Sequence, residues 1–189
     1  MNKTTSYPVV GIGFSAGGIE ALQTFLANLP NPTGASFIII PHLSAQNESQ
    51  LDKVLKRYTK LQISWITDHV IPQPECAYLL PPGKQLDFQA EAFLLRPRLP
   101  EQKINHMIDL GFTALAQAFQ RRVIGIVLSG MGNDGLTGAR AIEQQGGIVL
   151  VQNPETAQFQ SMPKSIISHD HPDMVATPKE LAGILMRML

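Results

Sequence analysis

Short, continuous apolar runs alternate along the chain with longer stretches in which apolar residues recur every three or four positions. The first pattern is typical of buried parallel strands and the second of amphipathic helices. We therefore predict an α/β fold: a three-layer, doubly wound, mainly parallel sheet with helices on both faces. The clearest strands are expected at residues 8–13, 36–40, 123–128 and 148–151, and the helices at 18–29, 50–58, 105–119, 136–145 and 178–188.

The middle of the chain departs from this alternation. Four short strand candidates are separated there by proline and glycine, at residues 63–65, 77–80, 86–88 and 92–95. The last two are expected to form a small β-hairpin insertion. Because the sequence contains no repeat and no low-complexity linker, we predict a single domain over residues 1–189, in which residues 1–7 form a disordered lead.

The amino-acid composition argues against several classes of function. Lys and Arg number 15, as do Asp and Glu, so the formal net charge is 0. Such a chain lacks the excess positive charge with which proteins bind nucleic acid or anionic membranes. No apolar run approaches the roughly 18 residues of a membrane span, and no signal peptide precedes the first strand. We therefore expect a soluble, cytoplasmic protein with no nucleic-acid partner and no membrane insertion.

Three loops of unusual composition follow predicted strands, at residues 13–18, 41–44 and 130–135. In an open parallel sheet, ligands bind in the crevice at the carboxyl ends of the strands. The three loops are therefore expected to line one crevice, and their residues are the candidates for chemistry.

The first of these loops fits two motifs. Residues 13–17 have the GxSxG spacing of a nucleophile elbow, a tight strand-to-helix turn that exposes the hydroxyl of Ser15. Residues 11–16 also fit the GxGxxA dinucleotide fingerprint, which requires an acidic residue about 20 positions later. No acidic residue lies between Glu20 and Glu48. This favours the elbow, while a nucleotide loop and a plain tight turn stay open.

A serine needs a base and an orienting group to act as a nucleophile. His42 follows the predicted strand nearest in sequence to the serine strand, so it is the first candidate for the base, and His106 is the reserve. Asp134, the one carboxylate in the third loop, can orient the imidazole, and the backbone N–H groups around Met131 can line an oxyanion hole. A satisfied histidine and a helix-capping aspartate are the alternatives, and composition does not separate them.

A metal centre has weaker support. His169, Asp170 and His171 offer two imidazoles and a carboxylate, but no third distant ligand accompanies them. We expect a solvated turn at these positions, and a site that uses neither metal nor cofactor.

Considered together, these loops resemble those of the catalytic domain of CheB-type chemotaxis protein-glutamate methylesterases. The resemblance runs from about Pro8 to the C-terminus and covers nearly the whole chain. Its strongest motifs are VGIGFSAGG at residues 10–18, Pro41-His42, and LSGMGNDG at residues 128–135. Further matching segments lie at residues 146–147, 151–157 and 161–163.

The resemblance implies a Ser-His-Asp triad of Ser15, His42 and Asp134, with the backbone amide of Met131 as the oxyanion donor. It further implies an enzyme that removes methyl groups from glutamate methyl esters on receptor helices, and also deamidates glutamines, through an acyl-enzyme. The expected partner is a methylated receptor or another protein substrate helix. Five further residues are expected to bind the substrate: Ala16, Gly17, Gly132, Asn133 and Asp109.

Two departures from the family pattern affect regulation and recognition. Regulated members carry an N-terminal receiver domain, which does not precede Tyr7 here. Regulation is therefore expected either to come from elsewhere, as from fused or separate regulatory and methyltransferase domains, or to be absent. At the rim of the site, where the family often has Arg-Pro-Ser-Val-Asp, residues 105–109 keep the Asp and lack the arginine. The altered rim motivates one alternative, a non-catalytic receptor-binding or signalling module. The glycine-rich first loop motivates another, a nucleotide-binding protein.

Overall fold

The structure, a computed structural model, describes residues 6–42, 49–98 and 106–189. Seven strands form one sheet in the order β3-β4-β2-β1-β7-β8-β9, and every neighbouring pair is parallel. The chain begins in the centre of the sheet, builds one side and then returns to build the other, which is the doubly wound order that the sequence predicts. The strands are β1 (Val9–Phe14), β2 (Ser36–Pro41), β3 (Gln62–Trp65), β4 (Cys76–Leu79), β7 (Val123–Val127), β8 (Ile148–Gln152) and β9 (Met174–Ala176).

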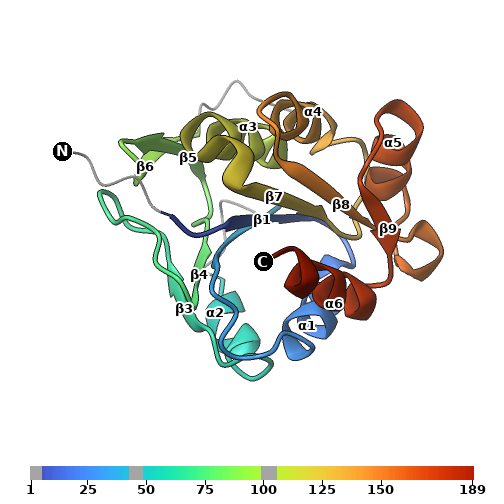
Figure 1. Cartoon of the computed structure of the whole chain (residues 1–189), viewed down its shortest axis with the longest axis horizontal. Helices are drawn as coiled ribbons and strands as arrows, with labels where there is room; N and C mark the ends of the chain where they lie inside the picture. The colour runs from blue at the N-terminus through green and yellow to red at the C-terminus, as the bar shows by residue number, and fades with distance from the viewer. Residues whose placement is uncertain (1–5, 43–48, 99–105) are drawn as a thin grey trace.

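Helices cover both faces of this sheet, as Figure 1 shows. One face carries α1 (Gly18–Ala27), α2 (Leu51–Leu55) and α6 (Pro178–Met188), whose apolar side chains form one core with the sheet. The opposite face carries α3 (Met107–Phe119), α4 (Leu136–Gln144) and α5 (Ser161–His169), which form a second core. The predicted three-layer fold is therefore confirmed.

Glycines in the central strand allow α3 to lie close to the sheet. A Cβ atom added to Gly11 would lie 2.6 Å from Leu115 Cδ1, and one added to Gly13 would lie 2.4 Å from Ile108 Cγ2. Both distances are too short for carbon atoms in contact. Two of the residues that fit the dinucleotide fingerprint are thus required by helix packing, which weakens the case for a nucleotide loop.

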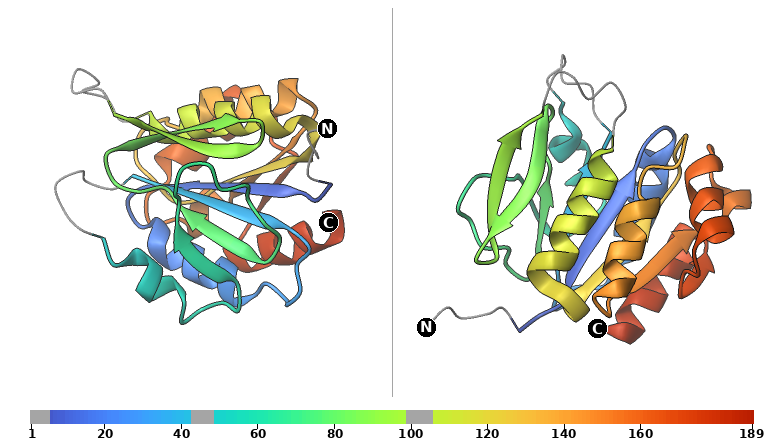
Figure 2. Two further views of the ribbon diagram at one scale, coloured as in Figure 1. Left: turned by 90° about the vertical axis from the view of Figure 1, so that its left-hand side faces the viewer. Right: turned by 90° about the horizontal axis from the view of Figure 1, so that it is seen from above.

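The predicted hairpin insertion is also confirmed. It consists of β5 (Lys84–Gln89) and β6 (Ala92–Pro97), which pair antiparallel in a separate two-stranded sheet. The hairpin lies beside α3, as seen from above in Figure 2 (right). Phe88 of β5 packs edge-on against Phe119 of α3, with their ring centroids 5.0 Å apart.

Two elements were not predicted, and both have weak apolar patterns. The edge strand β9 has only three residues, and its Met174 and Val175 are exposed. The helix α5 buries only Met162, Pro163 and Ile166, fewer than the pattern of an amphipathic helix requires. Two short 3₁₀ segments, η1 (Gln120–Arg122) and η2 (Pro154–Thr156), were likewise not predicted.

Some sequence predictions fall on residues that the structure leaves undescribed. The lead at residues 1–7 lies mostly outside the described ranges, as does residue 105 of the altered rim. The assignment of the whole chain to a single domain therefore stays a prediction. In the described ranges, none of the helices combines the length and the apolar character that crossing a bilayer would demand.

Candidate active site

The serine, histidine and aspartate predicted as a triad all lie at the same end of the sheet. Ser15 directly follows β1, His42 directly follows β2, and Asp134 lies in the loop between β7 and α4. Because β2, β1 and β7 are neighbours in the sheet, their carboxyl ends bring the three loops to one crevice, as expected from the sequence.

The turn that carries Ser15 is tight, and hydrogen bonds hold both the N–H and the C=O group of Ser15. Ser15 N donates to Ser129 O (3.0 Å), and Gly18 N donates back to Ser15 O (3.0 Å). Gly17, just before α1, has a φ of 70°, a left-handed conformation that glycine adopts without steric cost. The backbone therefore has the sharp strand-to-helix turn of a nucleophile elbow.

His42 and Asp134 are in direct contact. The Nε2 atom of His42 forms a short hydrogen bond with Oδ2 of Asp134. An ionised carboxylate only accepts hydrogen bonds, so a neutral His42 carries its proton on Nε2. The Nδ1 atom is then the nitrogen with a free lone pair, and it is the one that can accept a proton.

The Asp134 carboxylate is buried, with 4% of the residue exposed. It is held by the first turn of α3: Ile108 N donates to Oδ2 (3.0 Å) and Asp109 N donates to Oδ1 (2.8 Å). Unpaired N–H groups at a helix N-terminus stabilise negative charge. The fold thus supplies a buried carboxylate that is both charged and fixed in direction beside the imidazole.

Asp109 makes the reciprocal contact from α3 to α4. Its Oδ1 accepts hydrogen bonds from Gly135 N and Gly138 N, both at 2.9 Å, in the first turn of α4. Burial raises the pKa of Asp109 above its ordinary value, the two amides oppose that shift, and the nearby charge of Asp134 adds to it. Asp134 therefore caps α3, the helix that contains Asp109, and Asp109 caps α4, the helix that follows Asp134. That Asp109 binds substrate stays a prediction.

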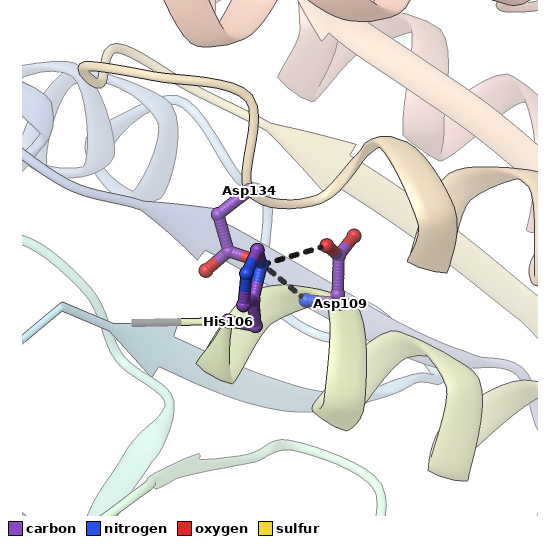
Figure 3. A group of neighbouring side chains, drawn as sticks. All are labelled: His106, Asp109 and Asp134. Carbon is purple, nitrogen blue, oxygen red and sulfur yellow. Dashed lines mark hydrogen bonds and ion pairs between the residues drawn. The ribbon is translucent and has the colours of Figure 1, made fainter. Parts of the chain in front are cut away.

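These two aspartates and His106 form a group of three side chains that could in principle ligate a metal ion (Figure 3). The Nδ1 atom of His106 lies 3.4 Å from Asp109 Oδ2. However, three of the four carboxylate oxygens already accept backbone or imidazole N–H groups. The N-termini of two helices also point their positive ends here, which disfavours an added cation. The donor set therefore fits helix capping better than metal binding.

The loop after β7 contains backbone N–H groups that donate to no described residue, and the N–H of Met131 is among them. Gly130 N donates to Phe159 O (3.0 Å) and Gly132 N donates to Ser161 Oγ (3.1 Å). Between them, Met131 N donates to no residue in the part of the chain that the structure describes. Met131 is 60% exposed. A free N–H group in a rigid loop is the kind of donor that an oxyanion hole needs.

Ser15 and His42 line the same cavity, which has a volume of about 490 Å³. Its walls are formed by Phe14, Ser15, Ala16, Gly17, Ile19, Glu20, Gln23, His42 and Gln158. The predicted substrate residues Ala16 and Gly17 are thus beside Ser15, whereas Gly132, Asn133 and Asp109 are not part of this wall. Across the described ranges, no residue forms a hydrogen bond with the Ser15 hydroxyl.

Sequence reasoning missed a buried polar network behind the serine turn. The Ser129 hydroxyl donates to Ala16 O (2.9 Å) and accepts from Phe159 N (3.0 Å). Ser129 N donates to Oε1 of Gln152 (2.9 Å), a residue that is 1% exposed at the end of β8. Gln152 could have been found by the rule applied to the other loops, since a polar residue ending a buried strand is unusual.

A parallel α/β domain with a serine, a histidine and a buried aspartate at adjacent strand ends has the architecture of a serine hydrolase. Within that class, the sequence model described as CheB methylesterase matches residues 10–185. The chain therefore belongs to the CheB methylesterase family, as the sequence motifs predict.

Individual relatives agree with this assignment. A protein of Leptospira interrogans, provisionally named a protein-glutamate methylesterase/protein-glutamine glutaminase, is 27% identical over 186 residues, covering 97% of this chain and 95% of the relative. The protein-glutamate methylesterase/protein-glutamine glutaminase of Moorella thermoacetica is 30% identical over 186 residues, but they make up only 44% of its length. Among solved structures, the Thermotoga maritima CheB methylesterase catalytic domain superposes with a TM-score of 0.89 at 25% identity, covering 98% of this chain and 100% of that one.

Proposed function

We propose that this chain is a cytoplasmic serine esterase that removes methyl groups from glutamate methyl esters on a chemoreceptor-type protein, and that it also deamidates glutamine side chains. The observation that carries the proposal is the contact between His42 Nε2 and the buried Asp134 carboxylate, at the cavity that Ser15 lines. Membership of the CheB methylesterase family supports the choice of substrate.

In the proposed mechanism, Ser15 attacks the carbonyl carbon of the glutamyl ester. Its proton passes to Nδ1 of His42, and Asp134 stabilises the imidazolium that results. The Met131 amide stabilises the negative charge on the carbonyl oxygen, with Gly132 and Asn133 beside it. Methanol leaves with a proton from His42, and water then hydrolyses the acyl-enzyme. With a glutamine substrate, the leaving group is ammonia.

The proposed mechanism includes one movement. The Ser15 hydroxyl, which forms no hydrogen bond to a described residue, is proposed to turn toward His42 Nδ1 by rotating between staggered side-chain rotamers. Catalytic hydrogen bonds are often loose without substrate and tighten in the complex. Substrate binding in the cavity, next to Ala16 and Gly17, is the event expected to drive that rotation.

The proposed substrate enters as a helix or other exposed segment of a receptor protein. A formal net charge of 0 provides no strong long-range steering, so docking depends on shape and on local groups around the cavity. Regulation is proposed to come from receiver or methyltransferase domains, fused to this chain or separate from it.

Methanol release from a methylated receptor fragment tests the proposal. The full chain should release methanol with steady turnover, and Ser15→Ala should release none while keeping the same circular dichroism spectrum. Binding of the fragment without turnover would contradict the proposal and support a non-catalytic receptor-binding module instead. Tight binding of NAD or ATP in a calorimetric titration would support a nucleotide-binding protein.

A further inference from the structure

A second, smaller cavity adjoins the one that contains Ser15. It has a volume of about 230 Å³ and lies between α1, the end of β8 and the start of α6. Its walls are formed by Gly17, Glu20, Ala21, Thr24, Gln152, Thr156, Gln158 and Pro178. Gly17, Glu20 and Gln158 line both cavities, so the two are neighbours separated only by these residues.

Glu20 gives the smaller cavity its charge. It is the one ionisable residue among the eight that line the smaller cavity, and neither cavity is lined by Lys or Arg. Within the described ranges, the Glu20 carboxylate forms no ion pair and accepts no hydrogen bond. Glu20 is exposed and lies in the first turn of α1, whose N-terminus stabilises its negative charge in part. With no cationic side chain paired to it, this carboxylate at the junction of two cavities favours a positively charged ligand group.

The two hydroxyl groups of the smaller cavity also suit a donor. The Thr24 hydroxyl donates to Glu20 O (3.0 Å) and the Thr156 hydroxyl donates to Asn153 O (2.8 Å). Each hydroxyl hydrogen is thus used within the protein. Thr156 Oγ also accepts from Gln152 Nε2 (3.3 Å), so it keeps one lone pair that can accept, and Thr24 Oγ keeps two. Lysine and arginine side chains donate hydrogen bonds and accept none, so they match this lining.

We propose that the smaller cavity is a specificity subsite, in which Glu20 receives a lysine or arginine side chain of the protein substrate while the glutamyl ester occupies the cavity at Ser15. This inference rests on the proposed function. Residues three or four positions apart on a helix lie about 5–6 Å from each other on one face. A helical substrate can therefore present the ester to one cavity and a basic residue, three or four positions away, to the other.

Binding to a catalytically inert variant tests the subsite separately from turnover. The probes are helical peptides with one γ-methyl glutamate and either Lys or Gln four positions before or after it. Their dissociation constants are measured by calorimetry with Ser15→Ala and with Ser15→Ala/Glu20→Gln, at low salt. A matched control, Ser15→Ala/Asp52→Asn, removes one negative charge from α2, where Asp52 pairs with Lys56 instead of lining a cavity.

The Lys peptide should bind Ser15→Ala about threefold to fivefold more tightly than the Gln peptide, which is the range for an exposed ion pair. Glu20→Gln should abolish this preference, Asp52→Asn should keep it, and high salt should weaken it. Equal binding of the two peptides, or a preference that survives Glu20→Gln, would overturn the subsite. Because Ser15 is absent from this assay, its result is independent of methanol release by the unmodified chain, which tests the proposed function.

Discussion

The two sides of the candidate active site are built differently. On one side, the Asp134 carboxylate is buried, bound by two backbone amides and in contact with His42. On the other side, the Ser15 hydroxyl faces a cavity of about 490 Å³ and has no hydrogen bond to any described residue. The side that holds His42 is fixed by the fold, whereas the side that Ser15 lines is open.

This difference suggests that the two sides contribute to different steps, one to turnover and the other to substrate binding. Electrostatic groups are most effective when the fold has already fixed their direction, since no reorganisation is then needed during the reaction. A cavity that must admit a protein side chain needs open space and groups free to bind. Substitutions on the fixed side should therefore act on turnover, and substitutions on the open side should act on substrate binding.

The largest effect is expected from Asp134→Asn. An amide in place of the carboxylate cannot stabilise the imidazolium and favours the wrong tautomer of His42, so kcat should fall by up to about 10⁴, or about 5.5 kcal/mol. KM should change little, because Asp134 does not line the cavity. Methanol release under saturating substrate provides the measurement. A variant with the turnover of the unmodified chain would show that His42 has another orienting partner.

The next largest effect concerns the packing beneath the site. In Gly13→Ala, the new methyl group would meet Ile108 Cγ2 at 2.4 Å, so the first turn of α3 must shift and with it the amides that hold Asp134. We expect the free energy of unfolding to fall by about 1–3 kcal/mol. Urea denaturation gives this value. Gly13 is not among the glycines with a positive φ, so the loss measures the contact with Ile108 and not backbone strain.

A third test asks whether Asp109 caps α4 or binds substrate. If Asp109 acts by capping α4, Asp109→Ala should lower the free energy of unfolding by about 1–2 kcal/mol and reduce kcat about tenfold. Asp109→Asn, which keeps an acceptor oxygen for Gly135 N and Gly138 N, should lose less than half as much of both. If Asp109 binds substrate, as the sequence predicts, KM should rise in both variants while kcat is kept.

The smallest effect is expected far from the site, at the end of α4. Burial, together with a hydrogen bond to Asp170, raises the pKa of Glu143 from 4.5 to about 7. A raised pKa in the folded state means that the protonated form stabilises the fold. This stabilisation is complete below about pH 4.5 and is lost as the pH rises through about 7.

Thermal unfolding between pH 5 and pH 8 measures this dependence. The melting temperature of the unmodified chain should fall with rising pH, and that of Glu143→Gln should fall less, because the glutamine amide keeps a donor toward Asp170 at every pH. Methanol release should be the same for both proteins at each pH. If the melting temperatures of the two proteins fell equally with rising pH, the assigned role of Glu143 would be contradicted.

The parts of the molecule that the sequence predicts well are those fixed by local pattern. The central strands β1, β2 and β7 are buried on both faces, so their apolar runs are continuous and easily recognised. The helix α6 has the boundaries that the sequence predicts, and in the structure Thr177 and Glu180 form a capping box at its start. The strand-end rule likewise brought Ser15, His42 and Asp134 to one crevice.

The sequence does not predict contacts between segments that are far apart along the chain. The hydrogen bonds from Gly135 N and Gly138 N to Asp109, and from Ser129 N to Gln152, join residues more than 20 positions apart. Nothing in the local pattern shows which amide a buried carboxylate or hydroxyl will meet. The position of Gln158 was missed for the same reason, because its contact with Gly17 joins segments that are far apart in the sequence.

Covalent labelling of the nucleophile tests the central claim most directly. We expect a fluorophosphonate to add one phosphonyl group to the full chain, and peptide mapping by mass spectrometry to place it on Ser15. Labelling should be much slower in His42→Ala and absent in Ser15→Ala. A chain that stays unlabelled, or that carries the group on a residue other than Ser15, would contradict the assignment of Ser15 as the nucleophile.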